Sequence, residues 1–314
     1  MSFQNPVFIP IPMTTKDQFV NHIHKLQDKI CAALEEVDGK STFIEDLWER
    51  EQGGGGKTRV IKNGGVFEKG GVNTSVVFGP LPEVMKQKFN TNANEFFACG
   101  LSLVLHPKNP LVPTVHANWR YFEMKNEQGE VIDSWFGGGT DLTPYYINET
   151  DCKHFHNTLK DTLDPFGESW YPKLKEACDE YFYNTHRSEG RGIGGIFYDY
   201  LRPDKDMPAN KLFDFAVAAG ESFIPSYVPI VENNMHKIYT QDQKEWQEVR
   251  RGRYVEFNLI HDRGTLFGLK TGGRIESILM SLPAVARWEY NMEITPESEE
   301  GKLVDVLQNP RNWV

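Results

Sequence analysis

Two neighbouring segments with a strict two-residue alternation place the strongest constraint on the fold of this chain. Residues 101–106 read LSLVLH and residues 115–123 read VHANWRYFE. Because side chains alternate between the two faces of a β-strand, each segment predicts a strand with one apolar face and one hydrogen-bonding face. The connection between them contains Pro107, Pro110 and Pro113 and is too short for the helical crossover that parallel strands need. We therefore expect an antiparallel pair.

The same alternation assigns the side chains of the second strand to faces. His116, Asn118 and Arg120 fall on the polar face, and Ala117 and Trp119 fall on the opposite, apolar face. A third strand is expected near residues 131–136, where the chain runs on into Gly137–Asp141. Three strands with short connections are typical of an antiparallel meander.

Helical and extended patterns on both sides of this meander predict an α+β fold. Helices are expected at 16–37, 168–185, 212–223 and 275–282, and further strands at 58–61, 75–78 and 253–259. Glycine-rich loops are expected at 53–56 and 190–195. Because no internal repeat or linker is visible, residues 1–314 are expected to form one domain in which helices cover an antiparallel sheet.

Composition narrows the classes of function. Aromatic residues make up 12% of the chain, which indicates a large aromatic core or, alternatively, a pocket for a large flat or cyclic organic ligand. The net charge of −10 argues against nonspecific nucleic-acid binding, which needs a basic face. A polyanionic ligand would require arginines concentrated at one place.

The cysteines and the N-terminal sequence indicate a reduced, cytoplasmic protein. Cys31, Cys99, Cys152 and Cys178 include no C-x-x-C pair, so the sequence shows no zinc ribbon, redox dithiol or iron–sulfur run. The first residues resemble neither a secretion signal nor a basic amphipathic presequence. No apolar run is long enough to predict a membrane span.

Two glycine motifs match nucleotide-binding patterns only in part. Residues 51–58 read EQGGGGKT, but Glu51 occupies the position where a phosphate-binding loop needs glycine. Residues 190–195 read GRGIGG, but the expected order is helix, loop and strand, whereas a dinucleotide fold needs strand, loop and helix. Neither segment is expected to bind a nucleotide.

The histidines form no recognisable metal motif. No H-E-x-x-H sequence is present, and no pair spaced by four residues would present two imidazoles on one helical face. Imidazole clusters do bind first-row metals, so a metal site remains a second interpretation. The favoured interpretation is a set of separate histidines that make hydrogen bonds.

Three polar clusters remain as candidates for a binding site: residues 116–120, residues 135–144 and residues 272–274. Each has a plainer structural interpretation. Asp141 could be a turn or helix-cap residue, Arg120 could form a salt bridge on the sheet surface, and Arg274 could be a solvated charge before a helix. Together with the aromatic excess, the clusters favour an anionic aromatic or tetrapyrrole ligand.

Long strings of the sequence resemble one enzyme family. They are LSLVLHPKNPLVPTVHANWRYFE, WFGGGTDLTPYY, HRSEGRGIGGIFYDY and RRGRYVEFNLIHDRGTLFGLKTGGRIESILMSLP, and together with shorter matches they cover nearly the whole chain. These strings resemble the oxygen-dependent coproporphyrinogen III oxidases. The resemblance implies a large antiparallel sheet with helices on both faces. It also implies conversion of coproporphyrinogen III to protoporphyrinogen IX in haem biosynthesis, in which O2 oxidatively decarboxylates two propionates to vinyl groups and two CO2 are released.

The resemblance also implies roles for individual residues. His116 matches the proton donor, Asp141 matches the carboxylate that faces the pyrrole nitrogens, and Arg120 is expected to take part in both catalysis and binding. The matched substrate contacts are Ser102, Asn118, Trp119, Arg120, Gly272, Gly273 and Arg274. Because the alternation turns the Trp119 side chain away from the polar face, any contact from Trp119 is expected to be through its backbone.

The resemblance implies no required organic cofactor, and O2 is the co-substrate. The oxygen-independent route uses three closely spaced cysteines for a [4Fe–4S] cluster, and this chain has no such group. Some bacterial relatives are described with a divalent metal at positions matching His106, His116, His156 and His186, so a metal is not required but remains possible. A homodimer with its interface within residues 254–290 is also implied.

The main alternative is a noncatalytic tetrapyrrole or haem carrier, for which aromatics and arginines would serve equally. Some relatives in the family work in the mitochondrial intermembrane space, which is a less favoured location for this chain than the cytoplasm.

Overall fold

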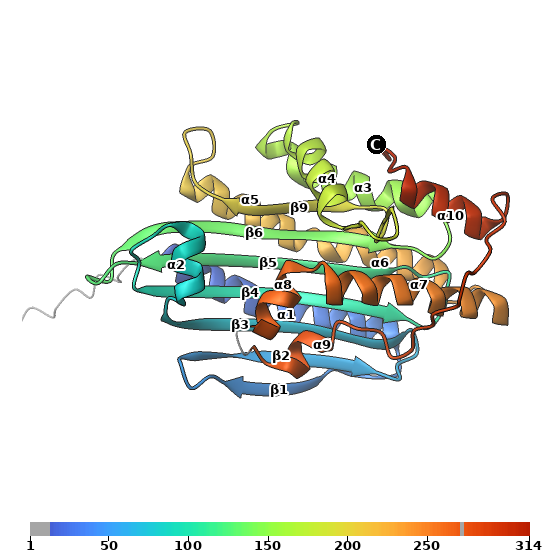
Figure 1. Ribbon diagram of the computed structural model, residues 1–314, viewed down its shortest axis with the longest axis horizontal. Coiled ribbons are helices and arrows are strands. Elements are labelled where there is room, and N and C mark those ends of the chain that lie inside the picture. The colour runs from blue at the N-terminus through green and yellow to red at the C-terminus, as the bar shows by residue number, and fades with distance from the viewer. Residues whose placement is uncertain (1–12, 271–272) are drawn as a thin grey trace, which may run out of the picture.

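Seven antiparallel strands form one large sheet, and nearly every strand pairs with the strand that follows it in the chain. The computed structural model describes residues 13–270 and 273–314. The order is β1-β2-β3-β4-β5-β6-β9, as Figure 1 shows. The strands are β1 (Ile44–Glu49), β2 (Gly54–Lys62), β3 (Phe67–Pro80), β4 (Glu95–Pro107), β5 (Thr114–Lys125), β6 (Val131–Thr143) and β9 (Gly195–Leu201).

Helices cover both faces of this sheet, which confirms the α+β fold. In Figure 1, α1, α5 and α6 run behind the sheet, and α7, α8 and α9 cross in front of it. The short strands β7 (Tyr183–Asn184) and β8 (Glu189–Gly190) form a separate pair. The helices are α1 (Thr15–Asp38), α2 (Glu83–Phe89), α3 (Glu149–Leu163), α4 (Trp170–Tyr181), α5 (Ala209–Glu221), α6 (Phe223–Asn234), α7 (Gln241–Ile260), α8 (Arg263–Lys270), α9 (Ile275–Leu279) and α10 (Glu299–Gln308).

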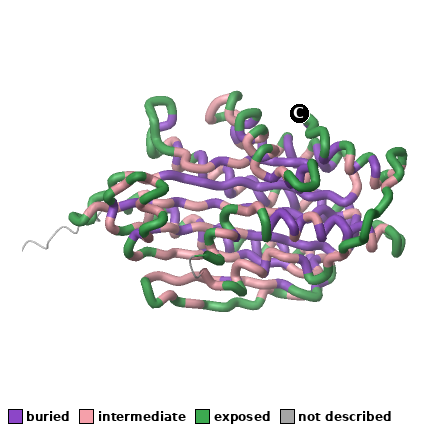
Figure 2. The backbone as a smooth tube through the Cα atoms, in the orientation of Figure 1, coloured by how far each residue is buried: buried purple, intermediate pink, exposed green. Residues whose placement is uncertain are grey.

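The main hydrophobic core lies behind the sheet, and Figure 2 shows long stretches of the central strands as buried. The apolar positions of β4 and β5 point into it, including Leu101, Leu103, Ala117 and Trp119, all fully buried. From α1 it receives a stripe spaced by three and four residues: Phe19, Ile23, Leu26, Ile30 and Leu34. The expected alternation of β4 and β5 is thereby confirmed, because their other positions face forward.

Three local predictions were wrong. Residues 253–259 belong to α7 and not to a strand, because the apolar stripe begins further upstream at Trp246 and Val249 and a capping box at Thr240 starts the helix. The expected helix at 212–223 is confirmed as α5, which ends at Glu221. A second helix, α6, begins at Phe223 and has Pro225 in its first turn, where the missing N–H of proline has no helical partner.

The other two errors concern glycine-rich segments that continue strands. Residues 54–56 open β2, and residues 137–141 extend β6 to Thr143, so the interpretation of Asp141 as a turn or cap residue is wrong. Glycine is favoured there because a neighbouring strand or side chain comes close: a Cβ at Gly55 would stand 2.2 Å from the carbonyl oxygen of Trp48 in β1. The 190–195 segment is a loop before β9 except at its ends, in keeping with the rejected dinucleotide motif.

The buried position of Trp119 gives a test of this fold. Its ring contacts Phe223 of α6 at 6.2 Å between centroids. The Trp119→Ala variant is expected to lose about 3–5 kcal/mol of unfolding free energy, because it leaves a large cavity in the core. Urea unfolding followed by circular dichroism measures this loss. Ile238→Ala, at a 95% exposed position, is the control and should change the free energy by less than about 0.5 kcal/mol. A loss below 1 kcal/mol for Trp119→Ala would contradict the assigned face.

Candidate active site

A row of polar side chains crosses the front face of the sheet. Direct cross-strand partners share one face, and the register joins Thr58 to Asn73, Asn73 to Ser102, Ser102 to Asn118 and Asn118 to Gly139. These side chains are half-buried apart from Thr58, which is buried. The face opposite the main core therefore presents hydrogen-bonding side chains on four strands, β2 to β5, because Gly139 of β6 has no side chain. The alternation in the sequence predicts this polar face for β4 and β5.

Arg120 lies one step along β5 from this row and is held from two sides. Its Nη1 donates to Oδ1 of Asn118 at 2.8 Å, and its Nη2 forms an ion pair with Oδ1 of Asp199 at 2.8 Å. The guanidinium lies over Gly137, where an added Cβ would stand 2.7 Å from its Nε. Since its side chain is 36% exposed, Arg120 can still receive a carboxylate from solvent.

His116 and Asp141 face each other across β5 and β6. They are direct cross-strand partners, and Nδ1 of His116 lies 2.8 Å from Oδ1 of Asp141. A carboxylate acceptor requires the proton on Nδ1, which leaves Nε2 as the ring nitrogen for proton exchange with a ligand. The His116 side chain is 20% exposed, whereas that of Asp141 is 1% exposed. His116 is therefore the member of the pair that a ligand can reach.

Asp141 is also bound by a buried arginine. Nη2 of Arg191 donates to both carboxylate oxygens at 2.7 and 2.9 Å, and its Nη1 donates to Oδ1 of Asn258 at 2.8 Å. Burial by itself raises the pKa of the Asp141 carboxyl, but Arg191 and His116 outweigh it and hold that pKa below its ordinary value. Asp141 is thus kept ionised and is suited to orient His116 and to stabilise its protonated form.

Arg191 is enclosed by aromatic rings. Its guanidinium carbon lies 4.0 Å from the ring centroid of Phe182, 4.8 Å from that of Tyr254 and 4.9 Å from that of Phe257. These cation–π contacts compensate part of the desolvation of a buried cation. The sequence reasoning missed Arg191, because the GRGIGG segment was assessed only as a nucleotide motif.

Arg274 lies on the same face at its other margin. Its Nη2 is 2.5 Å from Oδ2 of Asp46 on β1, and its Nη1 donates to Oγ of Ser277 at 3.2 Å. Four strand spacings separate β1 from β5, which corresponds to about 19 Å between the backbones under Asp46 and Arg120. The two arginines therefore lie far apart, at opposite ends of the polar row.

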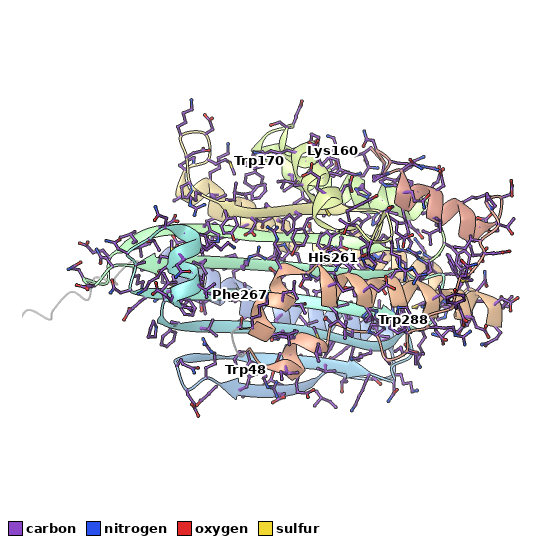
Figure 3. All side chains as sticks on the ribbon, viewed as in Figure 1. Trp48, Lys160, Trp170, His261, Phe267 and Trp288 are labelled. Atoms are coloured by element: carbon purple, nitrogen blue, oxygen red, sulfur yellow. The ribbon has the colours of Figure 1, made fainter. Side chains whose placement is uncertain are left out.

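The other residues expected to contact the substrate are Trp119, Gly272 and Gly273. Trp119 points into the core, as expected, so its side chain is remote from the polar row. The backbone N–H of Gly273 donates to the carbonyl oxygen of Gly268 at 2.8 Å, and Gly272 lies outside the described residues. Two aromatic side chains, Trp48 from β1 and Phe267 from α8, lie on the front of the molecule in Figure 3.

The four histidines of the possible metal site do not gather around one point. His106 is buried and contacts Thr114 and the carbonyl oxygen of Ser281. Burial above all, with Arg251 nearby, lowers the pKa of His106 to about 3. In the described ranges, 13–270 and 273–314, no group of three or more histidine, cysteine, aspartate or glutamate side chains is arranged to hold a metal ion.

The other histidines of that set have separate partners. His156 of α3 bonds to the Tyr171 hydroxyl and to the carbonyl oxygen of Ile193. Its pKa is also lowered to about 3, mainly by burial. Nε2 of His186 contacts Glu256 at 2.8 Å. Together with the His116 contact to Asp141, this means that the four rings serve different hydrogen bonds and do not fit one shared ion.

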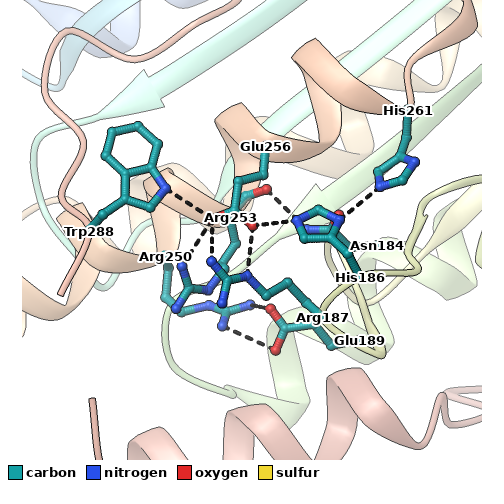
Figure 4. A network of polar contacts seen from close by, with 9 residues as sticks. All are labelled: Asn184, His186, Arg187, Glu189, Arg250, Arg253, Glu256, His261 and Trp288. Atoms are coloured by element: carbon teal, nitrogen blue, oxygen red, sulfur yellow. Dashed lines mark hydrogen bonds and ion pairs between the residues drawn. The ribbon is translucent and has the colours of Figure 1, made fainter. Parts of the chain in front are cut away.

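Figure 4 shows that Glu256 of α7 is the centre of a polar network that ties α7 to the β7–β8 hairpin. It accepts hydrogen bonds from Arg187 and from Nε1 of Trp288, and His186 bridges it to His261. Burial raises the pKa of Glu256, but these donors and Arg253 outweigh that effect and lower the pKa to about 2.

The low pKa of Glu256 predicts a pH dependence of stability. Because the pKa is near 4.5 in the unfolded chain and about 2 when folded, the contribution is present above pH 4.5 and is lost as the pH falls towards 2. The Glu256→Gln variant should be less stable than wild type by about 3 kcal/mol at pH 6, and this gap should close by pH 2. Urea unfolding across pH 2–6 measures the gap. Glu36→Gln, at an exposed position of α1, is the control, and a gap that is constant with pH would refute the assignment.

Comparisons with known proteins identify the family of this chain. Residues 18–313 match the family model of coproporphyrinogen III oxidase. Coproporphyrinogen-III oxidase 1, chloroplastic, of Arabidopsis thaliana is 49% identical over 311 residues, which is 96% of this chain and 80% of the relative. The oxygen-dependent coproporphyrinogen-III oxidase of Drosophila melanogaster is 51% identical over 93% of this chain and 76% of its own length. The mitochondrial enzyme of that name in Rattus norvegicus is 49% identical over 97% of this chain and 70% of its own. This chain belongs to the coproporphyrinogen III oxidase family.

Proposed function

We propose that this chain is an oxygen-dependent coproporphyrinogen III oxidase of haem biosynthesis. It converts coproporphyrinogen III to protoporphyrinogen IX by decarboxylating two propionates to vinyl groups. Family membership and relatives named for this activity at about half identity support the reaction. The structural observation that carries it is the common face of His116, Asn118 and Arg120, which combines a carboxylate-binding group with a proton-exchange group.

Binding relies on hydrogen bonds to the propionates at the rim of the macrocycle. Arg120 and Arg274 have the planar donor geometry that carboxylates match, and their wide separation suits a ligand with carboxylates on opposite sides. Ser102 and Asn118 lie between them on the polar row and supply further hydrogen bonds. Gly272, Gly273 and the backbone of Trp119 complete the proposed contacts.

The chemistry requires an oxidant and controlled proton transfer. Each propionate loses CO2 and a hydride equivalent, so two electrons pass to O2, which takes up one further proton to become H2O2. The reduced macrocycle is electron-rich, and we propose that it donates these electrons with no cofactor. His116 exchanges the pyrrole N–H proton at Nε2, and the ionised Asp141 stabilises the imidazolium that forms. In this arrangement Asp141 acts on the pyrrole through His116.

Self-association is proposed through the segment 254–290. This segment exposes apolar side chains that a monomer would leave in water: Leu259, Ile260, Phe267, Leu269, Ile275, Val285, Trp288 and Tyr290. A homodimer would bury part of this surface. Hydrogen bonds to Glu256 tie two parts of this segment, the end of α7 and Trp288, to each other and to Arg187.

A cytoplasmic location remains part of the proposal. The relatives from Arabidopsis thaliana and Rattus norvegicus carry the words chloroplastic and mitochondrial in their names, so members of this family occur in organelles. None of the helices in residues 13–270 and 273–314 has the length and apolar character needed to cross a membrane.

The balance of gases and products tests the reaction. With coproporphyrinogen III in air, the protein is expected to consume one O2 for each CO2 released, and to yield a product lacking two carboxyl groups. Strict removal of oxygen should abolish turnover, and a metal chelator should leave it unchanged. These rates are measured with an oxygen electrode and by chromatography of the oxidised products. Binding without CO2 release would favour the carrier alternative, and loss of activity with chelator would contradict the cofactor-free chemistry.

The roles of His116 and Asp141 give a second test. The His116→Ala variant is expected to turn over about 100-fold more slowly, because a positioned proton-transfer group typically contributes at least that factor. Its affinity for coproporphyrin III, an oxidised ring with the same four propionates, should stay within twofold. Asp141→Asn should lower turnover as well and also lower stability, since it leaves Arg191 buried without its counter-charge.

The control is His154→Ala on α3, which removes a histidine bonded to the carbonyl oxygen of Pro225 on the opposite side of the sheet. It should leave turnover unchanged. Near-normal turnover of His116→Ala would remove the proton-transfer role, and a carrier would show no difference in function between the two variants.

A further inference from the structure

A bulge in the edge strand β9 lies beside an acidic side chain, Asp199, on the front face. Tyr198 pairs with Gly138 and Leu201 pairs with Phe136, so Asp199 and Tyr200 together stand opposite the single residue Gly137. Tyr200 has a φ of +53°, in the left-handed region that a bulky residue seldom adopts. Bulges of this kind re-aim side chains, often beside functional sites.

The bulge changes which side chains face forward. In regular alternation Tyr200 would share the rear face with Tyr198, but its ring lies 5.4 Å from that of Trp135, which stacks on Phe122 at 4.5 Å on the front face. Asp199 and Tyr200 are therefore consecutive residues on one face. The Asp199 carboxylate accepts a hydrogen bond from the backbone N–H of Tyr200 at 3.0 Å, which fixes its direction.

The carboxylate fixed in this way points at Arg120. Asp199 holds Nη2 at 2.8 Å while Asn118 holds Nη1 at 2.8 Å, and the missing side chain of Gly137 leaves room for the guanidinium. The Asp199 side chain is only 19% exposed. A guanidinium has five N–H donors. With two of them directed at Asn118 and Asp199, the others remain for a substrate carboxylate.

We propose that Asp199 is a positioning residue that fixes the Arg120 guanidinium for binding a substrate carboxylate. An unfixed arginine samples many rotamers, and ordering it on binding weakens affinity. Asp199 removes that cost before the substrate arrives. Asp199 could instead repel the incoming propionate, and its removal would then strengthen binding. The two effects therefore predict changes in Kd of opposite sign for Asp199→Ala. This inference rests on the proposed function, in which Arg120 binds a propionate.

The test is a double-mutant cycle between Asp199 and Arg120. Asp199→Ala is expected to raise both the KM for coproporphyrinogen III and the Kd for coproporphyrin III about tenfold, with kcat within threefold of wild type. In an Arg120→Ala background, the same substitution should change the Kd less than twofold, because Asp199 acts only through Arg120. Fluorescence titration with coproporphyrin III gives the Kd for all four proteins.

Two further variants guard against a folding effect. Asp199→Asn keeps an acceptor for both Arg120 and the Tyr200 N–H, and it should recover most of the lost affinity. Asp133→Ala removes an aspartate of the neighbouring strand β6 that forms an ion pair with Arg202 at 2.7 Å. This control variant should leave the KM and the Kd within twofold of wild type. All variants are compared by thermal unfolding.

The outcomes separate the inference from the proposed function. If Arg120→Ala changes neither KM nor Kd, the carboxylate-binding role of Arg120 is wrong. If Arg120→Ala weakens binding but Asp199→Ala does not, or tightens it, only the positioning role is overturned. The positioning role is also overturned if Asp199→Ala still weakens binding in the Arg120→Ala background, or if Asp199→Asn binds as weakly as Asp199→Ala.

Discussion

The pleat of a single antiparallel sheet is the constraint on which the rest of this structure depends. Successive side chains of a strand point to opposite faces, so β4 and β5 place leucine, alanine and tryptophan in the core and serine, asparagine, histidine and arginine at the site. The same strands therefore stabilise the fold and build the site. A one-residue slip of register would exchange the two sets, which is why the large core also fixes the geometry of the polar row.

Within this frame, one buried charge pair orients the histidine of the candidate site. Arg191 neutralises Asp141 inside the protein, and Asp141 in turn orients His116 towards the exposed face. A buried carboxylate without such partners would take up a proton and lose the ability to stabilise an imidazolium. Three aromatic rings stabilise the buried charge of Arg191 through cation–π contacts. The many aromatic residues of the chain therefore serve the candidate site as well as the core.

Sequence reasoning found the polar face and missed the groups behind it. His116, Asn118 and Arg120 were assigned together from alternation, and the structure places them on one face. Asp199 and Arg191 were missed, because neither belongs to a periodic pattern that involves the other site residues. The FYDY segment contains Asp199 and the GRGIGG segment contains Arg191. Local periodicity reports neither the pairing of β9 with β6 nor the side-chain directions within a loop.

The sequence by itself determined the α+β class, the antiparallel order of its central strands and the face of each side chain in β4 and β5, because these follow from local alternation and short connections. Its resemblance to one family indicated the chemistry in outline. Only the tertiary structure decided that Arg274 meets Asp46 at the far margin, that Arg191 holds Asp141 and that Asp199 holds Arg120. Those outcomes depend on contacts between segments far apart in the chain, and no local pattern encodes the energies of such contacts.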